Sequence, residues 1–564
     1  MEQEKTAPAI RLPQNFPFYD WVPKPLGIIF LMVLFIPIMT VSGAYSVNSS
    51  EMVGGLGILS EHISFIGFVT SVGMAAFSPF FYTLVCVRRE KMMCVAGFSI
   101  LAMLSYICAN TDSLFLLALC SLIMGFVRQT LLMCNLFTLI KYAFGIEATA
   151  NITPGNEPLD EAGWDELDKQ KTVSMPTIYF FFMLLGQLGT WLTAWFAYNY
   201  EWQMVYYAMM GAMLVAILII FFTMPYNPFP TKHVPISFSK FGNVVVFSIM
   251  CCSFIYIMVY GKVLDWYDDK TIRWATLIAV VSTALFIYLE KTRRSPYFLL
   301  EAFRSRSILG GILLFVGLMI LNSSQMFVNV FVSVGMKTEN IQNAALGNWV
   351  LVGYFLGLVM TVLFNNKGVH LKWLFASGFL LIGAASLFMY FEVQTDGLLE
   401  RMKYPVIIRA TGMMLLYSVT AVYANQRMPY RLLSTWVCIM LTVRMIVGPG
   451  IGSAIYGNVF QHRQQYYITR YAHGLDRTNI ETAASYDQTA RGMQYQGKSE
   501  TEAQHMAAIS TKGKIQVQAT ISTIKEMAGW TIYGCLACAA IVVLVPWPKR
   551  DISRDTRESY MSGC

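Results

Sequence analysis

Recurring apolar runs are the feature of this sequence that most constrains its fold. A helix needs roughly 20 mostly apolar residues to cross the hydrocarbon core of a bilayer, and the 564-residue chain contains fourteen runs near that length. Hydrophobic residues make up 56% of the chain and charged residues only 13%. The sequence therefore predicts an all-α, polytopic membrane protein with fourteen transmembrane helices. The runs lie near 26–46, 63–86, 92–110, 114–144, 175–198, 203–224, 241–261, 271–290, 307–333, 344–364, 372–391, 404–424, 434–457 and 527–547.

Lysine and arginine predict the orientation of these spans. Short cytoplasmic loops are enriched in both residues. Loops and tails on the side of the termini hold 24 of them, and the short loops on the other side hold six. The first span lacks a small-residue cleavage site, so we expect it to be retained. We therefore expect a bacterial inner-membrane protein with both termini in the cytoplasm. The net charge of +8 reflects this topology and gives no support for nucleic-acid binding.

The spacing of the runs predicts a 6 + 2 + 6 arrangement. Transporters are often built from repeated halves, with the substrate path between them. The acidic stretch 147–173 is either a solvated cytoplasmic loop with a short helix or a regulatory segment beside the path. The long outer loop 458–526 is either an ordered helical cap or a docking surface for a periplasmic partner. The expected parts are a tail (1–25), a six-helix bundle (26–224), a linker with two extra helices (225–306), a second bundle (307–547) and a cytoplasmic tail (548–564).

The sequence offers no signature of an enzyme or of a metal or cofactor site. Ten of the eleven cysteines lie within or at the ends of apolar runs, so we expect no disulfide framework in the outer loops. Cys535 and Cys538 form a Cys-x-x-Cys with no nearby histidine, which fits helix packing better than a metal or redox site. His-rich clusters, paired intramembrane carboxylates and a phosphate-binding glycine loop are absent from the sequence. We expect no enzymatic activity, and ATP use is disfavoured.

Three arginines interrupt the apolar runs: Arg128, Arg409 and Arg444. An arginine at the centre of a membrane helix costs about 2.5–3.5 kcal/mol on insertion scales, so such residues normally face the bundle interior or a water-filled cavity. Each of the three either contributes to a substrate path or holds helix carbonyls and headgroups without touching substrate. Arg444 also precedes a helix-breaking triplet, Gly448-Pro449-Gly450.

Acidic residues are scarce within the runs, which limits the choice of a proton-coupling group. No Asp or Glu lies clearly in the middle of a span, and the nearest include Glu61 at the outer start of the second span and Glu290 at the inner end of the eighth. A proton-coupled carrier needs a group whose proton affinity changes with conformation. Glu61 with the adjacent His62 is the expected coupling pair; the alternative for both is a solvated helix cap.

Neutral polar residues within the spans are candidates for a substrate path. Asn135 lies in the fourth span, and Asn322, Gln325 and Asn329 lie in the ninth. The latter three follow i, i+3, i+7 spacing, which places them on one stripe of a continuous helix. That stripe faces either substrate or a neighbouring helix.

Residues 186–202, "GQLGTWLTAWFAYNYEW", resemble the antiporter motif of the major facilitator superfamily. Gly186 and Gly189 match the motif, whereas Gln187 replaces its proline and Thr190 its second glycine. Glycines let two membrane helices approach closely, so the resemblance implies a conformational role for Gly186 and Gly189.

Three further stretches narrow the resemblance to one family. "YGKVLDW" at 260–266 and "LEKTRRSPYFLLEAFRSRS" at 289–307 resemble the 14-span drug:proton antiporters of the EmrB/QacA type. "TVRMIVGPGIGSAIYG" is similar to a later span of that family, with Gly448, Gly450 and Gly452 near its small positions. The resemblance covers nearly the whole chain. It implies the major-facilitator fold with fourteen helices, alternating access and exchange of small molecules for protons.

The sequence also departs from that family's pattern. The loop after the second span keeps Arg88 and Arg89 but lacks the usual aspartate, and Asn365 replaces an aspartate after the tenth span. In the fourth span Gln129 aligns with the family motif, while Arg128 is displaced by two positions. These departures leave the fold expectation intact and leave the coupling ion and transport direction open.

Three functions fit these features. The leading hypothesis is proton-coupled efflux of hydrophobic or amphiphilic small molecules, in which a periplasmic adaptor and an outer-membrane channel are possible partners implied by the resemblance. The second is transport of an organic anion or siderophore, which the intramembrane arginines suit. The third is a membrane scaffold or sensor that has lost transport.

Overall fold

The computed structural model contains helices as its only regular secondary structure within the residues that it describes. These residues are 15–45, 49–80, 89–144, 161–226, 239–292, 297–299, 302–303, 306–336, 338–395, 397–425, 430–473 and 480–545. The helices before the predicted second bundle are α1 (Lys24–Thr40), α2 (Ser49–Leu56), α3 (Ser60–Phe77), η2 (Ser78–Phe80), α5 (Glu90–Ala109), α6 (Leu114–Phe144), α7 (Glu161–Asn199), α8 (Gln203–Thr223), α9 (Ser239–Tyr260), η4 (Trp266–Asp268) and α10 (Lys270–Thr292). Those that follow are α11 (Arg306–Asn322), α12 (Gln325–Val330), η6 (Phe331–Gly335), α13 (Asn340–Gly347), α14 (Val350–Asn366), α15 (Leu371–Glu392), η7 (Leu399–Met402), α16 (Lys403–Asn425), α17 (Tyr430–Thr442), η8 (Val443–Val447), α18 (Gly448–His473), α19 (Ile480–Tyr495) and α20 (Glu500–Leu544).

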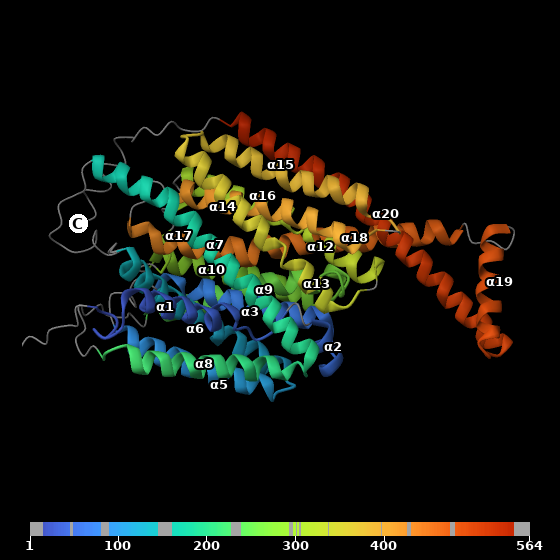
Figure 1. Cartoon of the computed structure of the whole chain (residues 1–564), viewed down its shortest axis with the longest axis horizontal. Helices are drawn as coiled ribbons and strands as arrows, with labels where there is room; N and C mark the ends of the chain where they lie inside the picture. The colour runs from blue at the N-terminus through green and yellow to red at the C-terminus, as the bar shows by residue number, and fades with distance from the viewer. Residues whose placement is uncertain are drawn as a thin grey trace, which may run out of the picture. The chain divides into compact units, whose positions relative to one another are not determined.

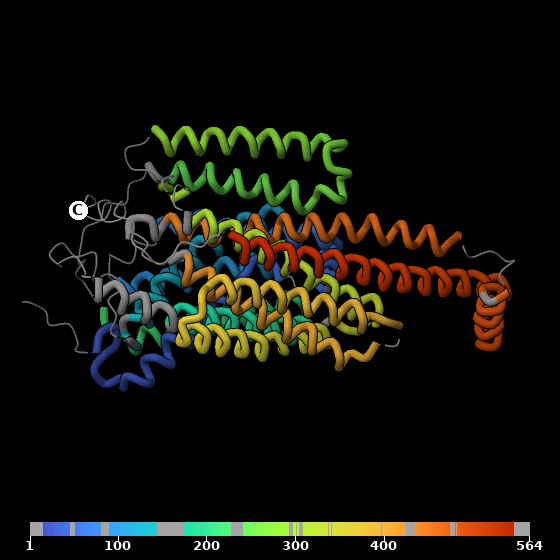
Figure 2. Tube along the Cα trace, turned by 90° about the horizontal axis from the view of Figure 1, so that it is seen from above, coloured from blue at the N-terminus to red at the C-terminus, as the bar shows by residue number. Residues whose placement is uncertain are grey.

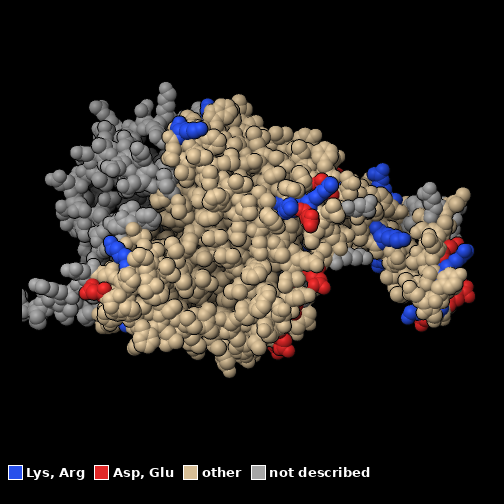
Figure 3. Space-filling view, in the orientation of Figure 1, with Lys and Arg blue, Asp and Glu red and all other residues tan. Residues whose placement is uncertain are grey.

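The helices confirm the predicted spans. Thirteen helical stretches in the described residues are long and apolar enough to cross a membrane, and Lys24–Thr40 is a shorter apolar helix at the position of the first predicted span. Over most of the face shown in Figure 3, the middle of the surface carries no Lys, Arg, Asp or Glu, and the charged atoms lie toward its ends. The chain is an all-α, polytopic membrane protein.

The chain divides into two compact units. The first comprises Met1–Lys171, Phe181–Ile312 and Ala424–Val447, and the second comprises Thr172–Phe180, Leu313–Tyr423 and Gly448–Cys564. The first unit therefore includes the α9–α10 hairpin, which Figure 2 shows in green as two adjacent helices, and within this unit α9 packs against α3. The predicted 6 + 2 + 6 domain boundaries remain a prediction.

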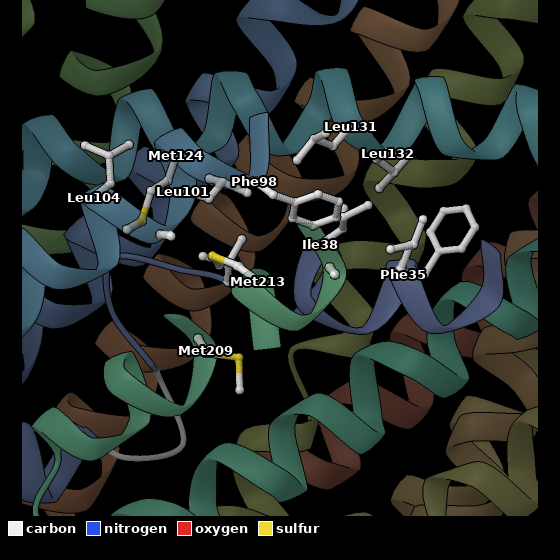
Figure 4. Packing of buried hydrophobic residues seen from close by; sticks show 14 of the residues in the cluster. Phe35, Ile38, Phe98, Leu101, Leu104, Met124, Leu131, Leu132, Met209 and Met213 are labelled. Atoms are coloured by element: carbon white, nitrogen blue, oxygen red, sulfur yellow. The ribbon is translucent and has the colours of Figure 1, made fainter. Parts of the chain in front are cut away.

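The core of the first unit lies among α1, α5, α6 and α8, which pack against one another. Figure 4 shows side chains from all four helices meeting there, including Phe35, Phe98, Leu131 and Met213, each of which is fully buried. A polar side chain on these helices has few hydrogen-bond partners within such an apolar core. Each polar residue there is therefore a candidate for a functional or structural role.

Close approach of α3 and α6 depends on two glycines. A methyl group at Gly73 would overlap the carbonyl oxygen of Leu122, and one at Gly125 would overlap that of Thr70. Interhelical association in lipid relies on close packing, which small residues permit. The Gly73–Gly125 crossing therefore fixes α6 against α3, and with it the position of the polar residues on α6.

In the second unit, the segment expected as a long outer loop is helical. Within 458–526, the second half of α18, all of α19 and the first half of α20 form a projection beyond α14, α15 and α16 (Figure 1). The helix α20 has 45 residues, about 67 Å at 1.5 Å per residue. A capping box at Ser499 and Glu502 begins it. The described residues of this segment are helical, as the first alternative expected, and docking of a partner stays a prediction.

The stretch 147–173, which the sequence predicts to be cytoplasmic, is described only from 161 onward. Residues 161–173 belong to the 39-residue helix α7, so the short helix expected there continues into the following span. No proline or glycine lies between Trp164 and Met175, and no residue in that stretch therefore interrupts the helix. The residues before 161 lie outside the described part of the chain.

We predict that Gly73→Ala destabilises the protein and that Gly67→Ala does not. Both glycines lie on α3, and alanine favours either helix by about 1 kcal/mol. Space around Gly67 is open, whereas overpacking at Gly73 costs about 1–3 kcal/mol. Thermal unfolding in detergent measures the difference. Equal melting temperatures for the two variants would contradict the close α3–α6 contact.

Candidate functional site

Arg128 caps the end of α1. Its guanidinium donates to the carbonyl oxygen of Met39 at 2.7 Å and to that of Val41 at 3.2 Å. The helix stops at Thr40, and Val41 is extended, so carbonyls at this end have no continuing helix to bond them. A cation at a helix C-terminus also complements the helix dipole. Arg128 therefore stabilises the break that ends α1 within the bundle.

Several buried polar atoms near Arg128 have no hydrogen-bond partner among the described residues. They are the Nε of Arg128, the Oη of Tyr45 and both amide atoms of Gln129. Gln129 is 1% exposed, and Tyr45 packs against Tyr206 with ring centroids 5.4 Å apart. An unpaired polar group in such a place costs about 1–3 kcal/mol. This group of atoms, on α6 and after α1, is the candidate site of the first unit.

Asn135 lies two turns further along α6 and has a structural contact. Its Nδ2 donates to the carbonyl oxygen of Leu31 on α1 at 3.0 Å, and its side chain is buried. Asn135 and Arg128 thus hold the same pair of helices together at two levels. Asn135 lies on the same helix as the candidate site but is already bonded.

In the second unit, Arg409 pairs with Asn322. The Nη1 of Arg409 donates to Oδ1 of Asn322 at 2.6 Å, while its Nε has no partner among the described residues. Arg409 is 5% exposed. The amide oxygen therefore holds a buried guanidinium that has no acid beside it in the described residues.

The expected stripe of Asn322, Gln325 and Asn329 does not lie on one continuous helix. A turn at Ser323 and Ser324 separates α11 from α12, and the amide of Ser324 bonds the carbonyl of Leu321 only three residues back. Asn322 contacts Arg409, whereas Gln325 and Asn329 are exposed. The i, i+3, i+7 spacing places three residues on one stripe only along an unbroken helix, and Ser323 and Ser324 interrupt this one.

Arg444 lies in a π-helical turn. This turn, η8, joins α17 to α18, and Pro449 is the second residue of α18. Because proline has no N–H, it cannot bond the carbonyl four residues earlier, and a widened turn just before it accommodates that loss. The last segment of the first unit ends at Val447, and the last segment of the second unit begins at Gly448. The triplet thus starts a helix at the point where the chain passes between units.

The glycines after Arg444 serve packing within the second unit. Gly448, Gly450 and Gly452 are buried, and a methyl group at Gly452 would overlap the Oγ of Ser323. Gly452 therefore lets α18 lie directly against the turn that follows α11.

Glu61 and His62 contact different partners at the N-terminal end of α3. Glu61 pairs with Lys262 at 3.2 Å, and Nδ1 of His62 lies 2.6 Å from Oη of Tyr260. Both contacts join the start of α3 to the end of α9 and the turn that follows. The coupling role of the pair remains a prediction; the contacts observed are interhelical ties.

The motif residues are only partly placed. A methyl group at Gly189 would overlap Thr40, which confirms a close approach of α7 to the end of α1, whereas space around Gly186 is open. Arg89 precedes α5, and its Nε has no partner among the described residues. Arg88 lies outside the described part of the chain.

Sequence reasoning missed one polar cluster. Glu290 is buried and bonds both Asn243 and the backbone of Phe298. The sequence placed Glu290 at the end of a span without a role. The asparagine on the neighbouring hairpin helix was the available signal, because an amide is an unusual choice in an apolar run unless it has a polar partner.

No family model matches the sequence, and neither does any curated protein. Solved structures do match. A mutant of the nucleoside transporter NupG aligns with 91% of this chain and 99% of its own, at 12% identity and a TM-score of 0.50. A mutant of the peptide transporter POT in complex with alafosfalin covers 92% and 94%, at the same identity and TM-score, and POT in complex with sulfate covers 92% and 93%. At this identity the likeness shows the fold alone: the chain has the fold of these transporters.

We predict that Arg128→Met destabilises the protein more than Arg128→Lys. Methionine leaves the carbonyls of Met39 and Val41 without their donor, at a cost of about 1–3 kcal/mol. Lysine retains a cation that reaches one carbonyl as a point charge. Thermal unfolding in detergent gives the order. A methionine variant as stable as the parent would show that Arg128 does not hold the end of α1.

Proposed function

We propose that this protein is a secondary active transporter of the bacterial inner membrane. It exports hydrophobic or amphiphilic small molecules in exchange for protons by alternating access. The likeness in fold to nucleoside and peptide transporters supports a carrier. One observation in particular supports a ligand: Gln129, Arg128 and Tyr45 carry buried polar atoms without partners in the described residues. Such atoms are costly unless water, a ligand or a proton meets them in another state of the cycle.

An organic anion or siderophore is the second candidate cargo. Arg128 and Arg409 each retain an Nε without a partner in the described residues. An arginine N–H is a strong donor to a carboxylate or sulfonate, and the hydroxyl of Tyr45 adds a neutral donor beside Arg128. Buried cations without paired acids favour an amphiphile with a negative group over a lipophilic cation.

The helical projection of the second unit supports a place for a partner. We propose that in a double-membrane bacterium the outer parts of α18, α19 and α20 dock a periplasmic adaptor that leads to an outer-membrane channel. The helix α20 is about 67 Å long, more than twice the hydrocarbon thickness of about 30 Å, so its first half extends beyond the bilayer. With both termini in the cytoplasm, as the loop charges predict, the first half of α20 lies on the periplasmic side.

A transport measurement tests the proposal. Everted membrane vesicles with the wild type are energised by respiration and given ethidium, a lipophilic cation, or taurocholate, an amphiphilic anion. We expect uptake above that of empty vesicles, lost on adding a protonophore, with taurocholate favoured over ethidium. Uptake equal to that of empty vesicles for both would contradict this cargo class, and uptake that survives the protonophore would contradict proton coupling.

Gln129→Leu separates a functional role from a structural one. Leucine fills similar space without the unpaired amide, so the variant should unfold at the same temperature as the parent or higher. Transport should fall by about tenfold or more if the amide meets cargo or proton, because sites of function are often held at a cost in stability. Destabilisation in detergent, or transport equal to that of the parent, would contradict a role for Gln129 in the path.

A further inference from the structure

Glu290 is the most deeply buried acid in the described part of the chain. It lies near the end of α10 in the first unit and is 5% exposed. A carboxylate buried at this depth is normally paired with a cation or neutralised by a proton. Within the described residues Glu290 forms no ion pair. Its hydrogen-bond partners, Asn243 and the backbone of Phe298, are uncharged. Protonation of the carboxylate would therefore neutralise the charge of this cluster.

The two carboxylate oxygens of Glu290 bind different elements. Oε1 accepts a hydrogen bond from Nδ2 of Asn243, on α9, at 2.6 Å. Oε2 accepts one from the backbone N–H of Phe298 at 3.0 Å. Asn243 is fully buried, and its Oδ1 has no partner among the described residues.

The pair Glu290–Asn243 accommodates either protonation state. With the carboxylate ionised, the Nδ2 of Asn243 donates to Oε1. When a proton from water forms an O–H bond at Oε1, rotation of the amide presents Oδ1 as the acceptor, with the heavy atoms in place. The oxygen of Asn243 that is now unpaired becomes the partner of the new hydroxyl. The site therefore gains or loses a proton without repacking the core.

The bond to Phe298 places Glu290 at a junction of three helices. Phe298 is the middle of three consecutive residues that each bind a different helix of the first unit. Tyr297 donates through Oη to the carbonyl oxygen of Ala76 at the end of α3. The backbone N–H of Leu299 donates to Oγ1 of Thr435 on α17 at 3.2 Å. A change at Glu290 thus acts on a segment that joins α10, α3 and α17.

Within the described residues, the other titratable groups that face Glu290 or Tyr297 are neutral near pH 7. Tyr297, from the segment itself, and Cys438, from α17, face Glu290, and Cys251, from α9, faces both of them. Phenols and thiols ordinarily ionise above pH 8. Among these groups, Glu290 is the one that carries a carboxyl.

We propose that Glu290 is a proton-binding residue of the transport cycle. Protonation replaces the charge-assisted bond from Phe298 with a neutral one, which is about half as strong. The weaker bond loosens residues 297–299 from α10. Because Leu299 bonds Thr435, this loosening also changes the contact of the segment with α17. The inference rests on the proposed proton-coupled function, and it assigns coupling to a residue other than Glu61 and His62.

The first test uses Glu290→Gln with Thr435→Val as its matched control. The glutamine keeps an acceptor for Phe298 but cannot be protonated, whereas valine at 435 removes the bond to Leu299 and leaves the carboxyl intact. Full-length proteins are reconstituted in liposomes with ethidium and taurocholate as probes. We expect Glu290→Gln to lose pH-gradient-driven accumulation by about tenfold or more while retaining exchange of the same probe across the membrane. Thr435→Val should retain exchange but lose part of the accumulation, because it cuts the link from the segment to α17 while the carboxyl stays intact.

The outcomes separate the two claims. A wild type without gradient-driven accumulation overturns the proposed function. A coupled wild type with an equally coupled Glu290→Gln overturns the role of Glu290, and so does loss of accumulation and exchange together in both variants, which would indicate a purely structural junction.

Infrared spectroscopy tests the protonation itself without any cargo. On acidification, a carboxylic-acid C=O band should appear in the wild type that is absent in Glu290→Gln. Its frequency should shift in Asn243→Ala, since the hydroxyl then lacks its acceptor. A band of unchanged intensity in Glu290→Gln would overturn the inference.

Discussion

The structure depends on one constraint: within a bilayer, every backbone polar group must find its partner inside the protein. The helix α1 stops at Thr40, and the carbonyls at its end receive two hydrogen bonds from Arg128 of α6. A buried guanidinium and an open helix end are each unfavourable in lipid. Placed together they satisfy each other, and the contact fixes α1 against α6 where the other polar atoms gather.

Buried side chains with an unpaired polar atom are the exception, and the described residues contain thirteen of them. Most hydroxyls on the helices bond a carbonyl of their own helix one turn back, as Thr138 and Thr361 do, which removes their polarity from the surface. Gln129 has no such recourse, and Tyr45 lies after the helix has ended. A buried polar atom that has no hydrogen-bond partner in one conformation is stabilised when water, cargo or a residue of a second conformation bonds it.

The fold was predictable because the apolar runs are long and well separated, so their number and order follow from length and hydropathy. The alternative in which an arginine holds helix carbonyls was also available from the sequence and describes Arg128. The Asn322 stripe failed because helical spacing presumes a continuous helix, which Ser323 and Ser324 interrupt. Contacts such as those of Glu290 join segments distant in sequence, and no local periodicity encodes them.

Side-specific labelling of Gln129→Cys with a membrane-impermeant maleimide tests alternating access most directly. Gln129 is 1% exposed, so its reaction with the reagent requires a conformational opening. Labelling is compared in right-side-out and everted vesicles, with the parent protein correcting for native cysteines. Alternating access predicts labelling from both faces, with the balance shifted by an imposed pH gradient. Labelling from one face only, or from neither, in a folded variant would contradict it.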